Sequence, residues 1–225
     1  MDFLELAAKR YSVRKFKEEK VRQEDLDKIL KAGMLAPTAH NEQPQRILVI
    51  NSDEALEKLK KCTACHFNAP TALLICSDKD ACWTRKYDGK KSYDIDAAIV
   101  TTHMMLEAAS IGVGTTWVMH FRPQVVREEF ALPDNYEASA MLMMGYPAPD
   151  AEPYPGHFEF KDEKELGDSG MVGFDAIFKH AADAGMEYPV VEVERYSFAP
   201  AESIKKSIDY LNNAPFVKES YPEKK

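Results

Sequence analysis

The feature that most constrains the fold is the stretch 94–111, which predicts a long helix with apolar residues on nearly all sides. One side carries Ile95, Ala98, Ile99, Thr102, Leu106 and Ala109, and the other carries Val100, Met104, Met105 and Ala108. A helix of this kind has to be covered, either within its own fold or at a subunit interface. We expect His103, in the middle of the helix, to be a satisfied core or interface histidine.

Helical and strand patterns alternate along the rest of the first 150 residues. We predict helices over residues 2–9, 22–36, 53–61 and 123–130, and strands over 46–50, 72–76, 115–119 and 139–144. Residues 77–93 are polar and irregular, with Trp83, Tyr87 and Tyr93 among them. A loop of this length is typical of a lid or a binding loop.

The composition changes where four prolines lie close together, at positions 147, 149, 153 and 155. We predict a domain boundary here, with one domain over residues 1–155 and an acidic, partly helical C-terminal extension over residues 156–225. Within the extension we expect helices over 171–184 and 201–211 and a strand over 190–193. The extension would either wrap around a partner subunit or cap the mouth of a site.

The net charge is −8 over 225 residues, which disfavours general binding of nucleic acids because that requires clustered positive charge. No apolar run is long enough to predict a membrane span. The start of the chain lacks the basic and apolar regions of a signal peptide, which favours a cytoplasmic location. The local group of basic residues between 9 and 22 therefore indicates a site for a small anion.

Arg10, Ser12 and Arg14 occupy alternate positions directly after the first predicted helix. In an extended chain their side chains would point the same way. Two guanidinium groups can hold an anionic oxygen cluster through paired hydrogen bonds, and a serine hydroxyl can donate one more. This is the chemistry of a phosphate site. The alternative is a basic, solvated helix exit whose charges pair with carboxylates.

The segment 36–44 reads Ala-Pro-Thr-Ala-His-Asn-Glu-Gln-Pro and connects a predicted helix to a predicted strand. Thr38, Asn41 and Gln43 can each donate and accept hydrogen bonds, which suits contact with a polar heterocycle or a polyol. The alternative is an ordinary connection bounded by prolines.

The four cysteines are Cys62, Cys65, Cys76 and Cys82. Cys76 lies in an apolar run, so we expect a small buried side chain. Cys62 and Cys65 have the spacing of a redox pair or of half a metal site, but no second well-spaced pair completes a zinc site. We predict reduced structural cysteines and no bound metal, with a redox or metal role for Cys62 and Cys65 as the alternative.

Four ordered motifs resemble the FMN-dependent nitroreductase family. They are Arg10-x-Ser12-x-Arg14-x-Phe16 and the segments 36–44, 111–117 and 144–147. The resemblance covers residues 3–150, about two thirds of the chain. It implies an α+β fold with a central, mainly antiparallel sheet flanked by helices, and an intertwined homodimer with two FMN sites at its interface. The predicted domain 1–155 would then be the FMN-binding domain.

The resemblance also implies a role for individual residues. The FMN phosphate and ribityl end would be held by Arg10, Ser12 and Arg14. The partner subunit would line the flavin with Pro37, Thr38, Ala39, Asn41 and Gln43. Met119 and His120 would lie by the flavin N5 edge, where a backbone N–H can polarise the ring, and Asn68 would contact the isoalloxazine edge. Where the family carries a basic residue after the Gly-Tyr-Pro strand end, His157 or Lys161 would have to serve.

The activity implied by the resemblance is hydride transfer from NADH or NADPH to flavin N5, with electrons passed to a nitroaromatic, a quinone or a similar small acceptor. This scheme requires no side-chain acid or base, so no catalytic residue is assigned, although His120 is placed to act as a proton donor. The alternative function is a flavin-binding carrier or regulator without turnover.

Overall fold

The computed structural model describes residues 2–159, Lys205 and Asp209. The chain divides into two units, Met1–Phe158 and Glu159–Lys225, and the architecture below is that of the first. The helices predicted over 171–184 and 201–211 and the strand predicted over 190–193 lie outside the described residues, apart from Lys205 and Asp209, which are both helical. The boundary predicted after residue 155 stays a prediction.

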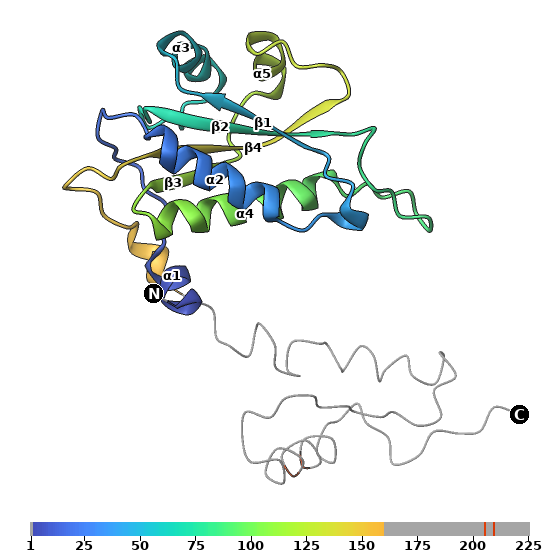
Figure 1. Cartoon of the computed structure of the whole chain (residues 1–225), viewed down its shortest axis with the longest axis horizontal. Coiled ribbons are helices and arrows are strands. Elements are labelled where there is room, and N and C mark those ends of the chain that lie inside the picture. The colour runs from blue at the N-terminus through green and yellow to red at the C-terminus, as the bar shows by residue number, and fades with distance from the viewer. Residues whose placement is uncertain (1, 160–204, 206–208, 210–225) are drawn as a thin grey trace, which may run out of the picture. The chain divides into compact units, whose positions relative to one another are not determined.

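The first unit is an α+β fold with helices on both faces of a four-stranded sheet (Figure 1). The strands are β1 (Gln45–Ile50), β2 (Thr71–Asp78), β3 (Gly114–Val118) and β4 (Tyr136–Gly145). Their order is β1-β2-β4-β3, and every neighbouring pair is antiparallel. The mainly antiparallel sheet predicted from the sequence is confirmed.

The helices are α1 (Phe3–Lys9), α2 (Gln23–Leu35), α3 (Asp53–Cys62), α4 (Tyr93–Ser110) and α5 (Pro123–Glu129), with short 3₁₀ turns η1 (Ala39–Asn41) and η2 (Pro155–Phe158). In Figure 1, α2 and α4 lie on one side of the sheet, and α3 and α5 lie on the other. None of the described helices is long and apolar enough to cross a bilayer.

The helix starts follow from local capping. At α1 the side chain of Asp2 accepts a hydrogen bond from the N–H of Glu5 at 2.9 Å, and the Glu5 carboxylate accepts one from the N–H of Asp2. At α3 the hydroxyl of Ser52 accepts a hydrogen bond from the N–H of Ala55 at 3.2 Å. These bonds satisfy backbone donors that have no partner within the helix.

Successive side chains of the central strands point to opposite faces of the sheet, so the apolar core has two parts, one on each face. The first part contains Leu73, Ile75, Leu142 and Met144 together with side chains of α2 and α4. The second part contains Ala72, Leu74, Met141 and Met143 together with side chains of α3 and α5. The sheet is therefore covered on both faces, which explains why β2 reads as a continuous apolar run.

The apolar helix α4 packs against both the sheet and α2. A side chain could not be added at Gly33 of α2, because a Cβ there would lie 2.8 Å from Cγ of Met104. Val100 and Met104 are fully buried, whereas Ile95 is 52% exposed. Within the described residues, α4 is thus covered on one side only. Whether a subunit interface covers the other side stays a prediction.

The stretch 10–16 is extended and runs along the free edge of β3. Ser12 forms a parallel bridge with Thr115, and the N–H of Val13 donates to the carbonyl of Thr115 at 2.9 Å. The hydroxyl of Thr116 donates to the carbonyl of Val13. Further along, Phe16 forms an antiparallel bridge beyond the end of β4. The backbone of the stretch is therefore fixed by the sheet.

Candidate functional site

The two arginines of the stretch 10–16 are not neutralised by carboxylates. Neither Arg10 nor Arg14 forms an ion pair with any described residue, and the Ser12 hydroxyl forms no hydrogen bond among them. The Arg14 guanidinium lies 6.0 Å from the centre of the Tyr154 ring. By contrast, Lys15 pairs with a carboxylate at 2.7 Å. The alternative, in which the basic residues pair with carboxylates, therefore holds for Lys15 but, among the described residues, not for Arg10 or Arg14. The guanidinium groups of both arginines are available to an external anion.

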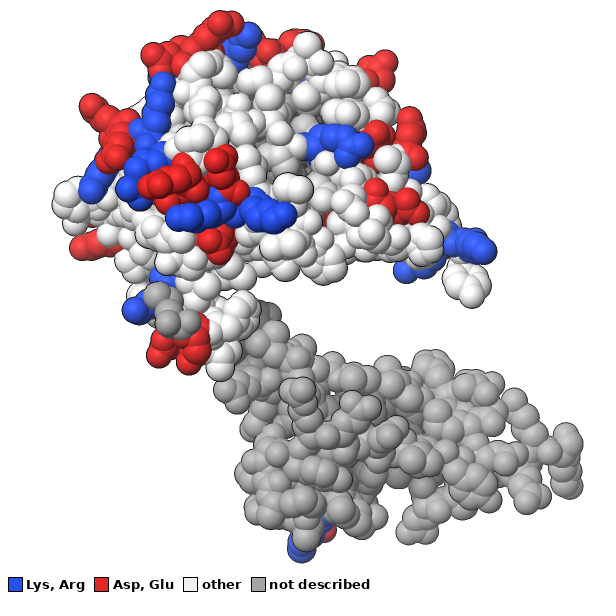
Figure 2. All heavy atoms as spheres, viewed as in Figure 1, with Lys and Arg blue, Asp and Glu red and all other residues white. Residues whose placement is uncertain are grey.

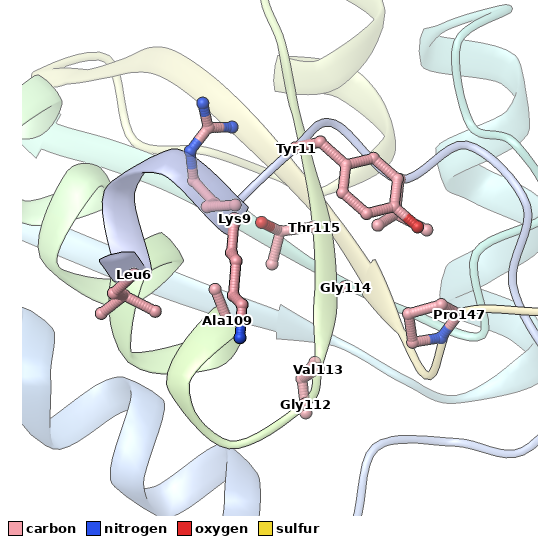
Figure 3. Close-up of a pocket in the computed structure, with 11 residues that line it drawn as sticks. Leu6, Lys9, Tyr11, Ala109, Gly112, Val113, Gly114, Thr115 and Pro147 are labelled. Atoms are coloured by element: carbon pink, nitrogen blue, oxygen red, sulfur yellow. The ribbon is translucent and has the colours of Figure 1, made fainter. Parts of the chain in front are cut away.

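A cavity of about 130 Å³ lies where the stretch meets the end of α4. Its walls are Leu6, Lys9, Arg10, Tyr11, Val13, Ala109, Gly112, Val113, Gly114, Thr115 and Pro147. Figure 3 shows Leu6 and Lys9 of α1 near Ala109, with β3 passing beside them. Of the three residues predicted to bind phosphate, the structure brings only Arg10 into this cavity.

Gly114 allows the stretch to approach the sheet closely. A Cβ at Gly114 would lie 2.7 Å from Cγ2 of Val13, which is 2% exposed. Gly112, two residues earlier, has a φ of +81°, a conformation that L-residues with side chains rarely adopt. These two glycines fix the turn between α4 and β3, and with it the position of Arg10 and Ser12.

The segment 148–158 returns along the outside of the stretch. The N–H of Ala148 donates to the carbonyl of Lys15 at 3.1 Å, and the hydroxyl of Tyr11 donates to the carbonyl of Ala151 at 3.2 Å. The ring of His157 lies 6.3 Å from the ring of Tyr11, centre to centre. His157 is thus placed beside Tyr11, while Lys161 lies outside the described residues.

The loop 37–43 is held in an unusual backbone conformation. His40, Asn41 and Gln43 have φ values of 54°, 58° and 50°, in the left-handed region that non-glycine residues rarely adopt. The hydroxyl of Thr38 accepts from the N–H of Gln43 at 3.1 Å, and the Gln43 amide donates to the Asn41 side chain at 3.1 Å. Strain of this kind persists only where the surroundings maintain it and is concentrated at functional sites. This observation favours a binding loop over an ordinary connection.

Asp96 anchors this loop to α4. Its side chain is 1% exposed, and Oδ1 accepts a hydrogen bond from the N–H of Ala39 at 2.8 Å while Oδ2 accepts one from the Ser92 hydroxyl at 2.7 Å. Sequence reasoning missed this residue because 57 positions separate it from Ala39. The available signal was an acidic residue between Ile95 and Ala97 in a mostly apolar helix.

The remaining predicted site residues lie directly after β3 and in the turn after α3. Met119, 67% exposed, and His120 directly follow β3. The hydroxyl of Thr63 donates to the carbonyl of His120 at 2.6 Å, which joins the turn after α3 to the end of β3. Asn68, exposed and with a φ of 50°, lies in that turn, and its N–H donates to Nδ1 of His66 at 3.0 Å.

The loop 37–43 and the Arg10 cavity are at opposite ends of α4. Asp96 holds the loop near the start of the helix, and Ala109 lines the cavity near its end. At 1.5 Å per residue these two positions are about 20 Å apart along the helix axis. The loop 37–43 and Arg10 of one chain are therefore separated by most of the length of α4.

A second cavity, of about 340 Å³, opens between α2, α4 and β1. It is lined by Leu30, Gly33, Met34, Gln43, Gln45, Arg46, Ile47, Val100 and Met104. The side-chain oxygen of Gln45 is buried and has no hydrogen-bond partner among the described residues. An unpaired acceptor beside the loop 37–43 suits a ligand that carries an N–H or O–H group.

The surroundings of Cys62 and Cys76 disfavour a reactive or metal-binding role for these two cysteines. All four are free thiols, and burial raises the pKa of Cys62 and of Cys76 to about 11 each. Thiolates, not thiols, are the nucleophiles and metal ligands, so a raised pKa disfavours both roles. Among the described residues there is no group of three or more His, Cys, Asp or Glu side chains that could hold a metal.

The chain matches known proteins over the described unit. The family model described as Nitroreductase family matches residues 7–68 and 63–146. A protein of Archaeoglobus fulgidus, provisionally named NADH dehydrogenase/NAD(P)H nitroreductase, is 30% identical over 173 residues, which cover 72% of this chain and 94% of that protein.

Solved structures give the same result. A nitroreductase family protein from Clostridium difficile 630 has 45% sequence identity and a TM-score of 0.71, and the match covers 75% of this chain and 98% of that one. An FMN-dependent nitroreductase from Clostridium difficile R20291 has 30% identity and a TM-score of 0.59, over 68% of this chain and 91% of that one.

Proposed function

Because this chain belongs to the nitroreductase family, we propose that it is an FMN-dependent oxidoreductase that uses NADH or NADPH as its electron donor. The comparisons show the family membership. The names of two relatives, an NAD(P)H nitroreductase and an FMN-dependent nitroreductase, support NAD(P)H as the donor and FMN as the cofactor. The observation in this chain that supports a bound phosphate is that Arg10 and Arg14 have no ion-pair partner, and the Ser12 hydroxyl no hydrogen bond, among the described residues.

The residues of the stretch fit the phosphate end of FMN. Arg10, Ser12 and Arg14 offer charged and neutral donors on a backbone fixed by β3, and no described carboxylate competes for them. Of the two residues named for a further basic contact to the phosphate, His157 and Lys161, only His157 lies in the described part, beside Tyr11.

The partner subunit is proposed to supply the other half of each site. The residues assigned to it are Pro37, Thr38, Ala39, Asn41 and Gln43, which the length of α4 keeps away from Arg10 of the same chain. The unburied side of α4 supports a homodimer, since Ile95 is exposed and the helix contains no Lys or Arg. Figure 2 shows mostly uncharged side chains over α4, below the charged residues of α2.

The end of β3 is proposed to face the reactive edge of the flavin ring. Bound FMN would supply hydride transfer from NAD(P)H and electron transfer to an acceptor such as a nitroaromatic or a quinone. The backbone N–H groups of Met119 and His120 would orient the ring edge, and Asn68 would contact the isoalloxazine, with the Thr63–His120 hydrogen bond holding both segments in register. The cytoplasmic location stays a prediction.

The purified protein tests this proposal directly. We expect the absorbance spectrum of a flavin after addition of FMN and gel filtration, and anaerobic bleaching of that band by NADH or NADPH. A protein that does not bind added FMN contradicts the whole proposal. A protein that binds FMN but keeps its yellow colour with both donors is instead a flavin carrier or regulator without turnover.

A further inference from the structure

Residues 79–92, between β2 and α4, form an arm that projects from the edge of the sheet (Figure 1). Its two sides are paired: Thr84 and Lys91 form an antiparallel bridge, and the N–H of Arg85 donates to the carbonyl of Lys90 at 2.9 Å. The sequence predicts residues 77–93 as an irregular loop of a length typical of a lid or a binding loop, without the pairing. The pairing gives the arm a defined shape, which is what a recognition element requires.

The tip of the arm is fixed by an ion pair. The guanidinium of Arg85 donates two hydrogen bonds to the carboxylate of Asp88, at 2.8 and 2.5 Å. This pair neutralises Arg85 but leaves two other cations at the tip. Among the described residues, the ammonium groups of Lys86 and Lys90 form no hydrogen bond and no ion pair. Tyr87, between them, is 97% exposed.

The charge of the arm is opposite to that of the chain. Residues 79–92 contain five Lys or Arg and two Asp, a net charge of +3, whereas the whole chain has a net charge of −8. Figure 2 shows blue side chains at the projecting end. A basic protrusion on an acidic protein attracts anionic ligands to one place and raises their local concentration there.

The base of the arm is joined to the proposed flavin loop. Ser92, the last residue of the arm, and Ala39 of the loop both donate to the buried carboxylate of Asp96. An extended chain rises about 3.3 Å per residue, so the tip at Tyr87 lies within about 16 Å of Ser92. A ligand that reaches from the loop to the tip would be long, would carry negative charge and would end in a group able to stack on an aromatic ring.

We propose that the arm binds the adenosine phosphate end of the NADH or NADPH donor, with Lys86 and Lys90 at its phosphates and Tyr87 against the adenine. This inference rests on the proposed function and extends it by assigning the donor-recognition element. Lysine binds phosphate as a point charge, and stacking of a base on an aromatic side chain tolerates either donor. NADPH, which has an additional 2′-phosphate, should depend on the two lysines more than NADH does.

The test uses full-length protein loaded with FMN and compares it with the double variant Lys86→Glu/Lys90→Glu. With a fixed quinone acceptor at low salt, we expect the KM for NADPH to rise about tenfold or more, with a smaller rise for NADH and little change in kcat. The affinity for FMN should not change. Tyr87→Ala should raise the KM for both donors to a similar extent.

Lys60→Glu is the control for added negative charge on α3, on the opposite side of the sheet, and it shifts the net charge by −2, half of the −4 shift in the double variant. An equal rise in KM for Lys60→Glu would mean that net charge alone is responsible and would overturn the proposal. Unchanged KM values in the arm variants would overturn it as well.

Binding of 2′,5′-ADP, measured by calorimetry, separates a failure of this proposal from a failure of the proposed function. Loss of that binding in the double variant but not in Lys60→Glu supports the arm even if the wild-type protein oxidises neither donor. If the wild-type protein is active but its binding of 2′,5′-ADP equals that of the double variant, the arm is not the donor site.

Discussion

Arg14 and Lys15 are adjacent cations, but only one of them is neutralised within the described residues. Lys15 lies 2.7 Å from the carboxylate of Asp150, and that hydrogen bond raises the pKa of the lysine. Arg14 faces Tyr154 instead and has no carboxylate partner among the described residues. The difference follows from the extended backbone, in which neighbouring side chains point to opposite sides. The two residues therefore make a matched pair for testing the phosphate site.

Replacing Arg14 by alanine should weaken FMN binding by about 1.5–3 kcal/mol, or roughly 10- to 150-fold, because a charge-assisted contact to phosphate is lost. Lys15→Ala should change the affinity less than about twofold, since it removes only an exposed ion pair. Quenching of FMN fluorescence on titration with apoprotein measures both constants. Equal losses in the two variants would contradict a specific role for Arg14.

Asp25 illustrates a polar contact that serves the fold. It is almost fully buried at the start of α2, and its Oδ2 accepts hydrogen bonds from the Tyr146 hydroxyl at 2.7 Å and from the Arg22 guanidinium at 2.8 Å. The Tyr146 hydrogen bond, followed by that of Arg22, lowers the pKa of Asp25. Tyr146 belongs to the Gly-Tyr-Pro strand end, so the contact joins α2 to the end of β4.

The lowered pKa of Asp25 predicts an acid-sensitive contribution to stability. The ionised carboxylate is favoured in the folded state, so its contribution is complete above the ordinary aspartate pKa and is lost as the pH falls through the lower, folded-state value. In Tyr146→Phe we expect a lower unfolding midpoint at neutral pH and acid unfolding that begins at a higher pH. Urea unfolding from about pH 2 to pH 7 measures both.

Tyr154→Phe is the control for this experiment, because the Tyr154 hydroxyl forms no hydrogen bond among the described residues. Its unfolding curves should follow those of the wild-type protein at every pH. If Tyr146→Phe behaves in the same way as Tyr154→Phe, the hydrogen bond to Asp25 contributes nothing to the pH dependence.

At the scale of elements, the loop 37–43 and the arm 79–92 depend on a single carboxylate. Asp96 is buried without a cation beside it in the described part of the chain, and such a group is costly unless its hydrogen bonds are complete. Its position in the first turns of α4 stabilises the negative charge. We infer that Asp96 serves to hold the strained backbone of the loop 37–43 in place.

Asp96→Ala should lower FMN affinity by about 5- to 100-fold, equivalent to about 1–3 kcal/mol for a lost pair of buried hydrogen bonds, with a smaller effect on the unfolding midpoint of the apoprotein. Asp96→Asn keeps the acceptor for the Ala39 N–H and should restore most of the affinity. Flavin fluorescence and thermal unfolding are the two measurements. If the asparagine variant is as weak as the alanine variant, positioning by hydrogen bonds is not the role of Asp96.

Local patterns in the sequence predict the helices and strands of the described unit to within a few residues. The largest difference is β4, predicted from residue 139 but beginning at Tyr136. Its first residues are polar or small and pair with the end of β2 beyond an irregularity between Ile75 and Cys76. A strand end that depends on a distant partner leaves no periodic apolar signal of its own.

The residues of the candidate site also fall into two groups, those that the sequence predicts and those that it does not. Arg10 and Arg14 could be found from their spacing, because the chemistry of paired guanidiniums is local. The anchoring of the loop by Asp96 and the pairing of the two sides of the arm could not be found from the sequence. Both arise from contacts that no local pattern in the sequence indicates. The positive φ values at His40 and Asn41 leave only a weak sequence signal, because both residue types are enriched in the left-handed region but adopt it far less readily than glycine.

At the scale of the whole molecule, a substitution on the exposed side of α4 should dissociate the proposed homodimer. Ile95→Glu places a charge on an exposed apolar position without disturbing the core of the chain. We expect a shift from dimer to monomer in light scattering, and a parallel loss of FMN binding because each site would lose its partner loop. A variant that is monomeric yet binds FMN normally would contradict a site shared between subunits.

Leu48→Glu provides the control for this variant, since Leu48 is an exposed leucine on the edge strand β1. It should remain a dimer and bind FMN normally. If both variants dissociate the dimer, the interface is not specific to α4.

The length of α4 has a genetic consequence. If each site takes its phosphate grip from one chain and its loop from the other, two different defective chains can complement each other. In a mixed dimer of Arg14→Ala and Asp96→Ala chains, one site would inherit both defects and the other would inherit neither. At an FMN concentration that saturates the wild-type protein but neither variant, co-expression of the two variants should therefore restore part of the activity. A chain that carries both substitutions should show no such recovery.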